Sequence, residues 1–247
     1  MLDFKIVHLP VLRSTNEHMQ FLIEAEEQPE GLVVTADEQL MGRGHGGNRW
    51  VSERGKNLLM SLLLKPSGLM PSAQFLLTAA VSLALTETLH EFLGQGKVQI
   101  KWPNDIYVDQ RKISGILIQN TIRGREILYS IIGIGLNVNQ AEFPPGLPNP
   151  VSMKQLTGVT VNRDEVLQVL LQSIAGYYSR LLDKNNHRVL MDSYCNRLFR
   201  FREWATYHDG QEFKAMITGI SEYGQLQLST SEGELRQYGF KEVEYIL

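Results

Sequence analysis

Two long helical patterns followed by a run of short alternating segments constrain the fold of this chain most strongly. Residues 71–93 and 163–183 repeat apolar side chains every three to four positions, which is typical of helices packed against a core. After Cys195 the pattern changes to short apolar–polar alternation punctuated by glycines, in residues 212–220, 224–229 and 234–237. This change predicts a helix-containing unit followed by a small β-barrel that begins near residue 191.

The composition excludes several classes of protein. A chain of 247 residues with 43% hydrophobic content can bury the core of one full domain and a smaller one, and its net charge of −3 disfavours nucleic-acid binding through bulk electrostatics. The one cysteine cannot form an intrachain disulfide, and the six histidines lack zinc-ligand spacing. We find neither a secretory signal pattern at the start nor an apolar stretch of the roughly 20 residues that a bilayer requires. We therefore expect a cytoplasmic protein without a nucleic-acid or membrane partner.

A glycine- and arginine-rich segment, QLMGRGHGGNRW, extends from Gln39 to Trp50. Glycines let backbone N–H groups turn toward a ligand, and arginines offer forked donors that match carboxylate or phosphate oxygens. An ordinary mobile surface loop could have the same composition. We call residues 42–49 the anion loop, because binding an anion is the function that its composition favours.

A second cluster, KWPNDIYVDQRKISGIL, follows from Lys101 to Leu117. Its turn formers at 103–105 and 109–110 separate three apolar stretches, which predicts three successive strands joined by tight turns. Taken singly, its polar residues are ordinary solvated turn residues. Taken together they indicate a site composed of Lys101, Asn104, Asp105, Arg111 and Lys112.

Small polar residues near the start form a third signal, because Ser14, Thr15 and Asn16 precede a helical pattern over residues 17–27. Ser14 or Thr15 could cap this helix, and the N–H groups and hydroxyls at the same position could also hold a polar ligand. The two interpretations are compatible.

A β-rich segment over residues 129–140 carries two glycines, Gly133 and Gly135, followed by Asn137. Glycine inside a strand marks a bulge or a close approach by another backbone or a ligand. The GxG of this segment lacks the longer GxGxxG spacing and the chain has no GxxxxGK[ST], so this segment supports neither a Rossmann nor a P-loop site.

In this order the segments resemble those of the biotin–protein ligases. Ser14-Thr15-Asn16 is similar to the STN segment of that family, Gly42-Arg43-Gly44 to its GRG loop, and Gly133 to Asn137 to its GxGxN segment. The stretch from Lys101 to Leu117 contains its KWPND and RKxxGIL motifs. Each match is modest alone, whereas the whole series in sequence order is hard to obtain by chance.

The resemblance implies an α+β fold, with a mixed β-sheet flanked by helices, like that of class II synthetases, over residues 1–188. A small SH3-like β-barrel would follow over residues 189–247. The implied enzyme activates biotin with ATP to biotinyl-5′-AMP and transfers biotin to a lysine of a biotin carboxyl carrier domain, in a biotin-dependent carboxylase. Two anions approach each other in the first step, so fixed positive charge and Mg²⁺-bound ATP are expected.

Roles for individual residues also follow from the resemblance. Lys112 would contact the biotin carboxylate, Arg43 and Lys101 would supply further positive charge, and Asn104 and Asp105 would lie near the reacting phosphate. Asp105 could bind Mg²⁺, directly or through water, or act as a base, although a plain Asn-Asp turn would look the same. Trp50, Trp102 and residues 58–64 could form an apolar wall. The implied biotin- and nucleotide-binding residues are Ser14, Thr15, Asn16, Gln39, Gly42, Arg43, Gly44, His45, Trp50, Lys112, Gly115 and Asn137.

The anion loop departs from the pattern GRGRxGRxW of many relatives, because His45 and Asn48 stand where those relatives have arginines. The loop therefore carries fewer permanent charges. We expect this chain to retain the adenylate less tightly, or to depend on a partly protonated His45. Phe143 is a candidate for stacking on adenine, since the following segment has no tryptophan.

Two other functions stay open. Attachment of lipoate or octanoate to lysine uses a related site, although Ser14, Thr15 and Gln39 suit the polar ureido ring of biotin. A biotin sensor without catalysis would be expected to lack Lys112 or Arg43. About a dozen residues precede Ser14, too few for the DNA-binding domain of some relatives. We therefore expect a ligase without a repressor role, as a monomer or a homodimer.

Overall fold

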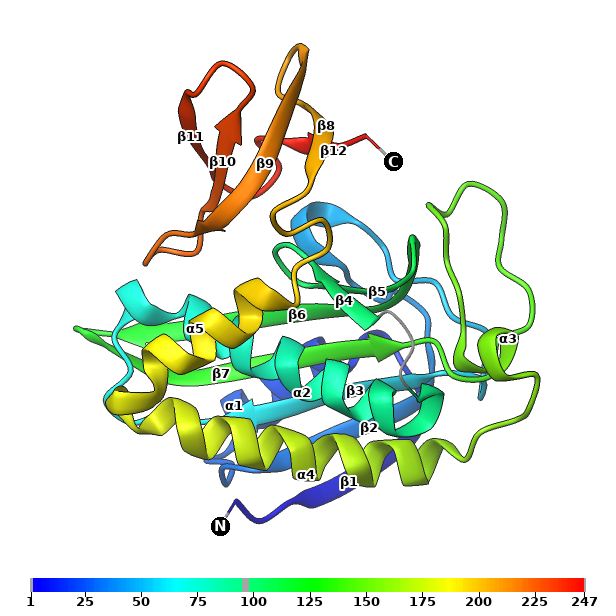
Figure 1. Ribbon diagram of the computed structural model, residues 1–247. Coiled ribbons are helices and arrows are strands. Elements are labelled where there is room, and N and C mark those ends of the chain that lie inside the picture. The colour runs from blue at the N-terminus through cyan, green and yellow to red at the C-terminus, as the bar shows by residue number, and fades with distance from the viewer. Residues whose placement is uncertain (1, 95–97, 247) are drawn as a thin grey trace.

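The computed structural model describes residues 2–94 and 98–246, and within these ranges the chain forms a seven-stranded and a five-stranded sheet (Figure 1). The strand order is β1-β2-β3-β7-β6-β5-β4 in the first sheet and β11-β10-β9-β8-β12 in the second. The strands of the first sheet are β1 (Lys5–Leu12), β2 (Leu32–Gln39), β3 (Leu58–Leu64), β4 (Val98–Lys101), β5 (Asp105–Val108), β6 (Arg111–Arg123) and β7 (Glu126–Leu136). The strands of the second sheet are β8 (Trp204–His208), β9 (Glu212–Ile220), β10 (Leu226–Thr230), β11 (Leu235–Tyr238) and β12 (Glu244–Tyr245).

The first sheet is mixed, as expected. Strands β1 and β2 are parallel, whereas the other neighbouring pairs are antiparallel. On one face lie α2 (Phe75–Leu93), α4 (Arg163–Leu182) and α5 (His187–Asn196), and on the other lies α1 (Thr15–Ala25) (Figure 1). The short α3 (Met153–Thr157) follows the long loop after β7. The predicted flanking of a mixed sheet by helices is confirmed.

Strand β3 shows why its sequence, LLMSLLL, lacks polar–apolar alternation. All seven of its residues are buried, because helices cover both faces of the sheet at this position. Met60, Leu62 and Leu64 point into the larger core beside α2, while Leu63 packs in the smaller core beside α1. Ser61, between them, is the polar exception and becomes part of the site described below.

Helix α2 corrects one sequence-based expectation. Residues Pro71–Leu93 are long and apolar enough to cross a membrane by length and composition, although we expected no such segment. Two thirds of the most apolar window is buried inside the protein, where α2 packs against α4, α5 and the sheet. Its hydrophobicity is thus explained by a central place in the core.

The second sheet is antiparallel throughout and compatible with the predicted small barrel. The predicted boundary at residue 189 falls within α5, which packs on α2. The hydroxyl of Tyr194 in α5 donates to the carbonyl of Pro103 at 2.8 Å, which ties α5 to the first sheet. We therefore propose that the boundary lies in the connector 197–203, between α5 and β8.

Candidate active site

A cleft of about 770 Å³ opens at one end of the first sheet, beneath the anion loop. It brings together segments that lie far apart in the sequence: the start of α1, the anion loop, strands β5 to β7 and the C-terminal segment 240–245. Thirteen of the predicted site residues line it: Ser14, Thr15, Asn16, Gln39, Arg43, Gly44, His45, Trp50, Lys101, Asn104, Asp105, Lys112 and Gly115. Gly42, Arg111 and Asn137 lie outside this lining.

The start of α1 forms a buried polar corner of the cleft. The Oε1 atom of Gln39 accepts from the backbone N–H of Thr15 at 2.7 Å and lies 3.1 Å from its hydroxyl. Ser61 bridges this corner, with its hydroxyl 2.7 Å from Thr15 Oγ1 and 2.6 Å from Asn16 Oδ1. Ser14 occupies the N-cap position of α1, yet its side chain makes no capping hydrogen bond. The polar corner is thus better suited to a ligand than to capping alone.

Trp50 packs on glycines of the sheet. A Cβ atom at Gly135 would collide with the indole of Trp50, and one at Gly115 would lie 3.2 Å from it. A side chain at Gly133 would likewise collide with the amide of Asn16. The glycines of β6 and β7 therefore serve close packing by cleft residues, as their place inside strands suggested. The indole N–H of Trp50 is buried and has no hydrogen-bond partner among the described residues.

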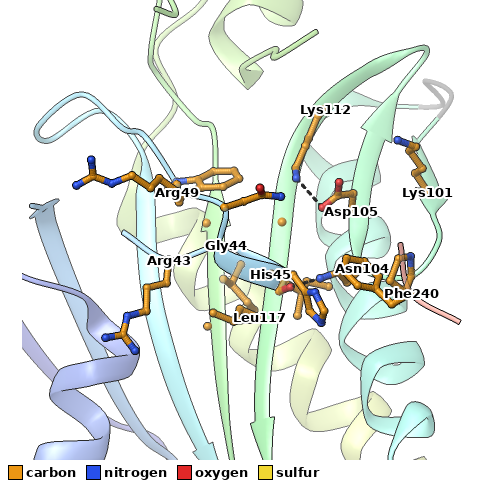
Figure 2. A pocket seen from close by; sticks show the side chains of 18 of the residues that line it. Arg43, Gly44, His45, Arg49, Lys101, Asn104, Asp105, Lys112, Leu117 and Phe240 are labelled. Atoms are coloured by element: carbon orange, nitrogen blue, oxygen red, sulfur yellow. Dashed lines mark hydrogen bonds and ion pairs between the residues drawn. The ribbon is translucent and has the colours of Figure 1, made fainter. Parts of the chain in front are cut away.

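Lys112 and Asp105 face each other across β5 and β6, with 2.6 Å between Lys112 Nζ and Asp105 Oδ1 (Figure 2). The backbone of Lys112 is also fixed from outside the sheet, since its N–H donates to the carbonyl of Asn149 at 2.8 Å and its carbonyl accepts from Val151. Both side chains are about one quarter exposed. The ammonium is therefore held at the cleft and remains reachable by a substrate anion.

A magnesium ion would find few protein ligands in this cleft. In the part of the chain that the structure describes, no three His, Cys, Asp or Glu residues cluster closely enough to hold a metal. Asp105 and Glu244 are the carboxylates of the lining, and Asp105 is engaged by Lys112. This donor set suits a cation brought in with substrate phosphates, since Mg²⁺ is bound by one or two carboxylates plus phosphate oxygens.

Lys101 lies deeper, at the end of β4. Its Nζ atom is 5.3 Å from the ring centre of Tyr107 and 5.2 Å from that of Tyr245. Burial lowers the pKa of Lys101, while the nearby charge of Asp105 opposes this shift. The aromatic rings stabilise the cation without neutralising it.

Asn104 has a partner in the backbone of β6. Its side-chain amide donates to the backbone carbonyl of Ile116 at 2.5 Å, and the backbone carbonyl of Asn104 accepts from the N–H of Ile116. These two bonds fasten the turn between β4 and β5 to β6. The position of Asp105, the next residue, follows from this attachment.

The arginines of the anion loop point away from Lys112 and Asp105 (Figure 2). Arg43 pairs with Glu17 of α1 at 3.1 Å, and its side chain is half exposed. Arg43 and Arg49 form a β-bridge, which makes the loop a small hairpin, and the backbone N–H of Trp50 donates to the carbonyl of Gly42. In this state the loop offers the cleft its backbone rather than its guanidinium groups.

His45 turns toward the second sheet. The centre of its ring lies 3.7 Å from that of Phe240, and Lys241 Nζ donates to the carbonyl of Gly46 at 2.9 Å. Burial, reinforced by the charge of Lys241, lowers the pKa of His45, while Asp105 acts in the opposite direction. His45 is therefore mainly neutral at pH 7 and does not replace an arginine charge.

A second hollow of about 400 Å³ adjoins the cleft on the other side of Trp50. Its lining includes Asn137 and Phe143, together with Lys112 and residues of the anion loop. Asn137 is buried and donates to the carbonyl of Val151 at 3.1 Å, so it anchors the loop after β7. Phe143 lies where a flat ring bound in this hollow would meet it.

A buried polar junction behind the anion loop gave no signal in the sequence. Asn57 donates to Gln140 Oε1 at 2.7 Å and accepts from the backbone N–H of Val138 at 3.0 Å. Gln140 Oε1 also accepts from the N–H of Glu53, and Asn139 N–H donates to the carbonyl of Lys56. Ser61 was missed as well, since nothing but its polarity within an apolar strand distinguishes it in the sequence.

Comparisons with known proteins identify relatives of this chain. Residues 8–137 match the Biotin/lipoate A/B protein ligase family. The bifunctional ligase/repressor BirA of Bacillus subtilis is 33% identical over 242 residues, covering 94% of this chain and 72% of its own length. The biotin–[acetyl-CoA-carboxylase] ligase of Paracoccus denitrificans is 32% identical over 207 residues, covering 81% of this chain and 85% of its own length.

A solved structure shares the whole architecture. The biotin protein ligase from Aquifex aeolicus, in complex with biotin and ATP, superposes with a TM-score of 0.82 at 25% sequence identity, covering 98% of this chain and 99% of the other. The fold and the cleft thus define a ligase-type catalytic domain followed by a small β-domain. The chain belongs to the Biotin/lipoate A/B protein ligase family.

Proposed function

We propose that this chain is a biotin–protein ligase, which activates biotin with ATP and transfers it to a lysine of a biotin carboxyl carrier domain. The observation that carries the proposal is the position of Lys112 in one cleft with the polar corner of Thr15 and Gln39. Relatives named as biotin ligases, and a relative bound to biotin and ATP, support it. Family membership alone would also allow lipoate as the substrate.

In the proposed pose, the ureido ring of biotin occupies the polar corner, which offers both donors and acceptors. Its thioether ring and chain then lie along Trp50, Gly115 and Gly135, where a flat apolar surface borders the sheet. This pose directs the carboxylate toward Lys112. A dithiolane ring of lipoate has neither an N–H donor nor a carbonyl acceptor to exchange hydrogen bonds with this corner, which disfavours it.

In the first step, a carboxylate oxygen of biotin attacks the α-phosphorus of ATP, and pyrophosphate leaves. Lys112 exchanges Asp105 for the substrate carboxylate and then follows the negative charge that develops on the phosphoryl oxygens. Lys101, at the end of β4, adds a second positive charge to the cleft. Mg²⁺ bound to ATP would neutralise phosphate charge, with Asp105 as its protein contact once Lys112 has moved.

In the second step, the amine of the acceptor lysine attacks the acyl carbon of biotinyl-5′-AMP, and AMP leaves. Asp105 is the candidate base that would accept the proton of this amine, because its carboxylate is released from Lys112 in the first step. A pH–rate profile that loses one ionisation in Asp105→Asn would support this role, and an unchanged profile would exclude it.

We further infer a cytoplasmic location, where biotin-dependent carboxylases and ATP are found together, and we expect a monomer or a homodimer. Sedimentation with and without biotin would measure the oligomeric state.

The decisive experiment incubates the protein with biotin, ATP, Mg²⁺ and a carrier domain, with parallel lipoate and octanoate reactions, and measures the acceptor mass. We expect the mass of one biotin to be added, and a rate at least about 100-fold lower for Lys112→Ala. Lys214→Ala, an exposed lysine of β9, is the matched control and should react normally. Modification by lipoate or octanoate alone would contradict the proposal.

Failure with all three acids, despite measurable biotin binding, would favour a sensor. Removing Mg²⁺ with a chelator should stop adenylate formation and leave biotin binding intact. Loss of biotin binding on chelation would contradict the expected arrival of the metal with ATP.

A further inference from the structure

The anion loop is in contact with a turn of the second sheet, at residues 239–242. Lys241 Nζ donates to the carbonyl of Gly46, and a Cβ atom at Gly46 would lie 2.5 Å from Nζ and Cε of the same lysine. Gly46 also has a positive φ of 64°. A glycine at this position therefore lets the loop turn and leaves room for the lysine side chain.

The turn fixes Lys241 firmly. Lys241 has a φ of 65°, which is uncommon for a residue with a long side chain. The carboxylate of Glu242 accepts from the N–H of Gly239 at 2.6 Å, and the N–H of Glu242 donates to the carbonyl of Gly239 at 3.2 Å. Val243 follows and is buried in the core. The lysine is thus held over the cleft by a closed turn with a buried anchor.

The other cations of the cleft lining are engaged or turned away. Lys112 is paired with Asp105, Arg43 is paired with Glu17, and Arg49 points away from the cleft (Figure 2). Lys101 lies between two aromatic rings. Among the residues that the structure describes, Lys241 has no carboxylate within ion-pair distance, and its bond to Gly46 uses one of three N–H donors.

We infer that Lys241 is an anion-binding residue of the cleft, supplied by the second sheet, and that it binds the phosphate groups of the nucleotide substrate. The anion loop is then completed by a residue about 195 positions away in the sequence, since its own arginines face outward. The identity of the nucleotide as ATP rests on the proposed function, whereas the role of Lys241 toward phosphate does not.

Substitutions of Lys241 distinguish a role of its charge from a role of its packing. Lys241→Met keeps the aliphatic chain that packs against Gly46 and removes the ammonium. Lys241→Arg keeps a positive charge with a different shape. If charge matters, the methionine variant binds phosphate weakly and the arginine variant largely retains binding.

The test measures the binding of ATP, inorganic pyrophosphate and biotin by calorimetry, at low and at high salt. For Lys241→Met we expect ATP and pyrophosphate to bind about tenfold more weakly at low salt, with a smaller salt dependence than the wild type. Biotin binding in the absence of ATP should be unchanged. Lys214→Met, on β9, should match the wild type and controls for a general loss of charge.

Two results would overturn the inference. Unchanged ATP and pyrophosphate binding by Lys241→Met would show that the charge is not used. An equal loss of ATP and biotin binding, together with a lower melting temperature, would show that Lys241 acts only by packing. If the wild type transfers no biotin to a carrier domain, the proposed function fails, while the comparison of phosphate binding still decides the role of Lys241.

Discussion

At the scale of single residues, the contact between Trp50 and Gly135 leaves little room for any substitution of the glycine. We predict that Gly135→Ala displaces the indole of Trp50, because the added methyl group would collide with it. The KM for biotin should rise by about tenfold or more, as the apolar surface for its ring is disturbed. Steady-state kinetics with varied biotin measures this effect.

Gly176→Ala is the matched control. Gly176 lies within α4, and an added Cβ meets no atom within 4 Å. This variant should be more stable by about 0.5–1 kcal/mol, since alanine favours a helix, with normal kinetics. An unchanged KM in Gly135→Ala would show that Trp50 does not border the bound biotin.

The lowered pKa of His45 predicts how the stability of the folded protein depends on pH. Burial lowers its pKa below the ordinary 6.5, so between the folded pKa and 6.5 the unfolded chain binds more protons than the folded one. The stability contributed by neutral His45 is therefore fully present above pH 6.5 and is lost as the pH falls below it. The charges that face this ring are those of Lys241, which opposes protonation, and Asp105, which favours it.

We expect His45→Asn to lose less unfolding free energy than the wild type between about pH 7.5 and about pH 5.5, because it lacks this titration. Urea denaturation at both pH values measures the difference. Parallel losses in the two proteins would contradict a lowered pKa at His45. Adenylate release should also be independent of this titration near pH 7, since the ring is already neutral.

At the scale of secondary-structure elements, the buried junction of Asn57 and Gln140 connects the segment between the anion loop and β3 with the loop after β7. We predict that Asn57→Ala costs about 1–3 kcal/mol of unfolding free energy, because Gln140 Oε1 and the N–H of Val138 lose a buried partner. The same variant should make residues 42–57 more susceptible to protease, and chemical denaturation together with limited proteolysis measures both effects.

Gln28→Ala serves as the comparison for the junction. Gln28 is also a buried amide, but it donates to the carbonyl of Leu22 at the end of α1, away from the cleft. It should lower stability without changing cleavage in the anion loop. Similar cleavage patterns in the two variants would show that the junction has no specific effect on the loop.

The sequence predicted most elements because local pattern suffices where packing agrees with it. Helix α4 and strand β9 follow their predicted ranges closely, and the three strands from Val98 to Arg123 follow the turn residues at 103–105 and 109–110. Helix α5 was not predicted, since its buried residues include Leu190 and Tyr194 but most of its surface is polar. Its identity as a helix depends on packing against α2.

At the scale of the whole molecule, Trp102 joins the two sheets. Its indole N–H donates to the carbonyl of Gly224 at 2.9 Å, across 122 positions of sequence. We predict that Trp102→Phe lowers the unfolding free energy by about 1–3 kcal/mol, since a buried carbonyl loses its partner and the smaller ring leaves space. A lower melting temperature by calorimetry, with weaker ATP binding, is the expected outcome.

The weaker ATP binding follows because the second sheet carries Lys241 and Tyr245 into the cleft. Tyr207→Phe provides the comparison, since its hydroxyl is buried in the same sheet without a hydrogen-bond partner among the described residues. It should change stability little and leave ATP binding intact. Normal ATP binding in Trp102→Phe would show that the sheets need not be held together for phosphate binding.

The sequence by itself determined the main helices and the short C-terminal strands, because periodicity and turn residues are local properties of the chain. Its motifs, through the family resemblance that they carry, also implied the mixed sheet and most residues of the cleft. The sequence also grouped Lys112 and Asp105 in one cluster, but the register shift between Ile106 and Tyr107 is what puts both side chains on one face of the hairpin. Only the tertiary structure decided that Arg43 pairs outward with Glu17, that burial lowers the pKa of His45, and that Lys241 reaches the anion loop. These outcomes depend on desolvation and on contacts between distant segments, and no local pattern in the sequence encodes either.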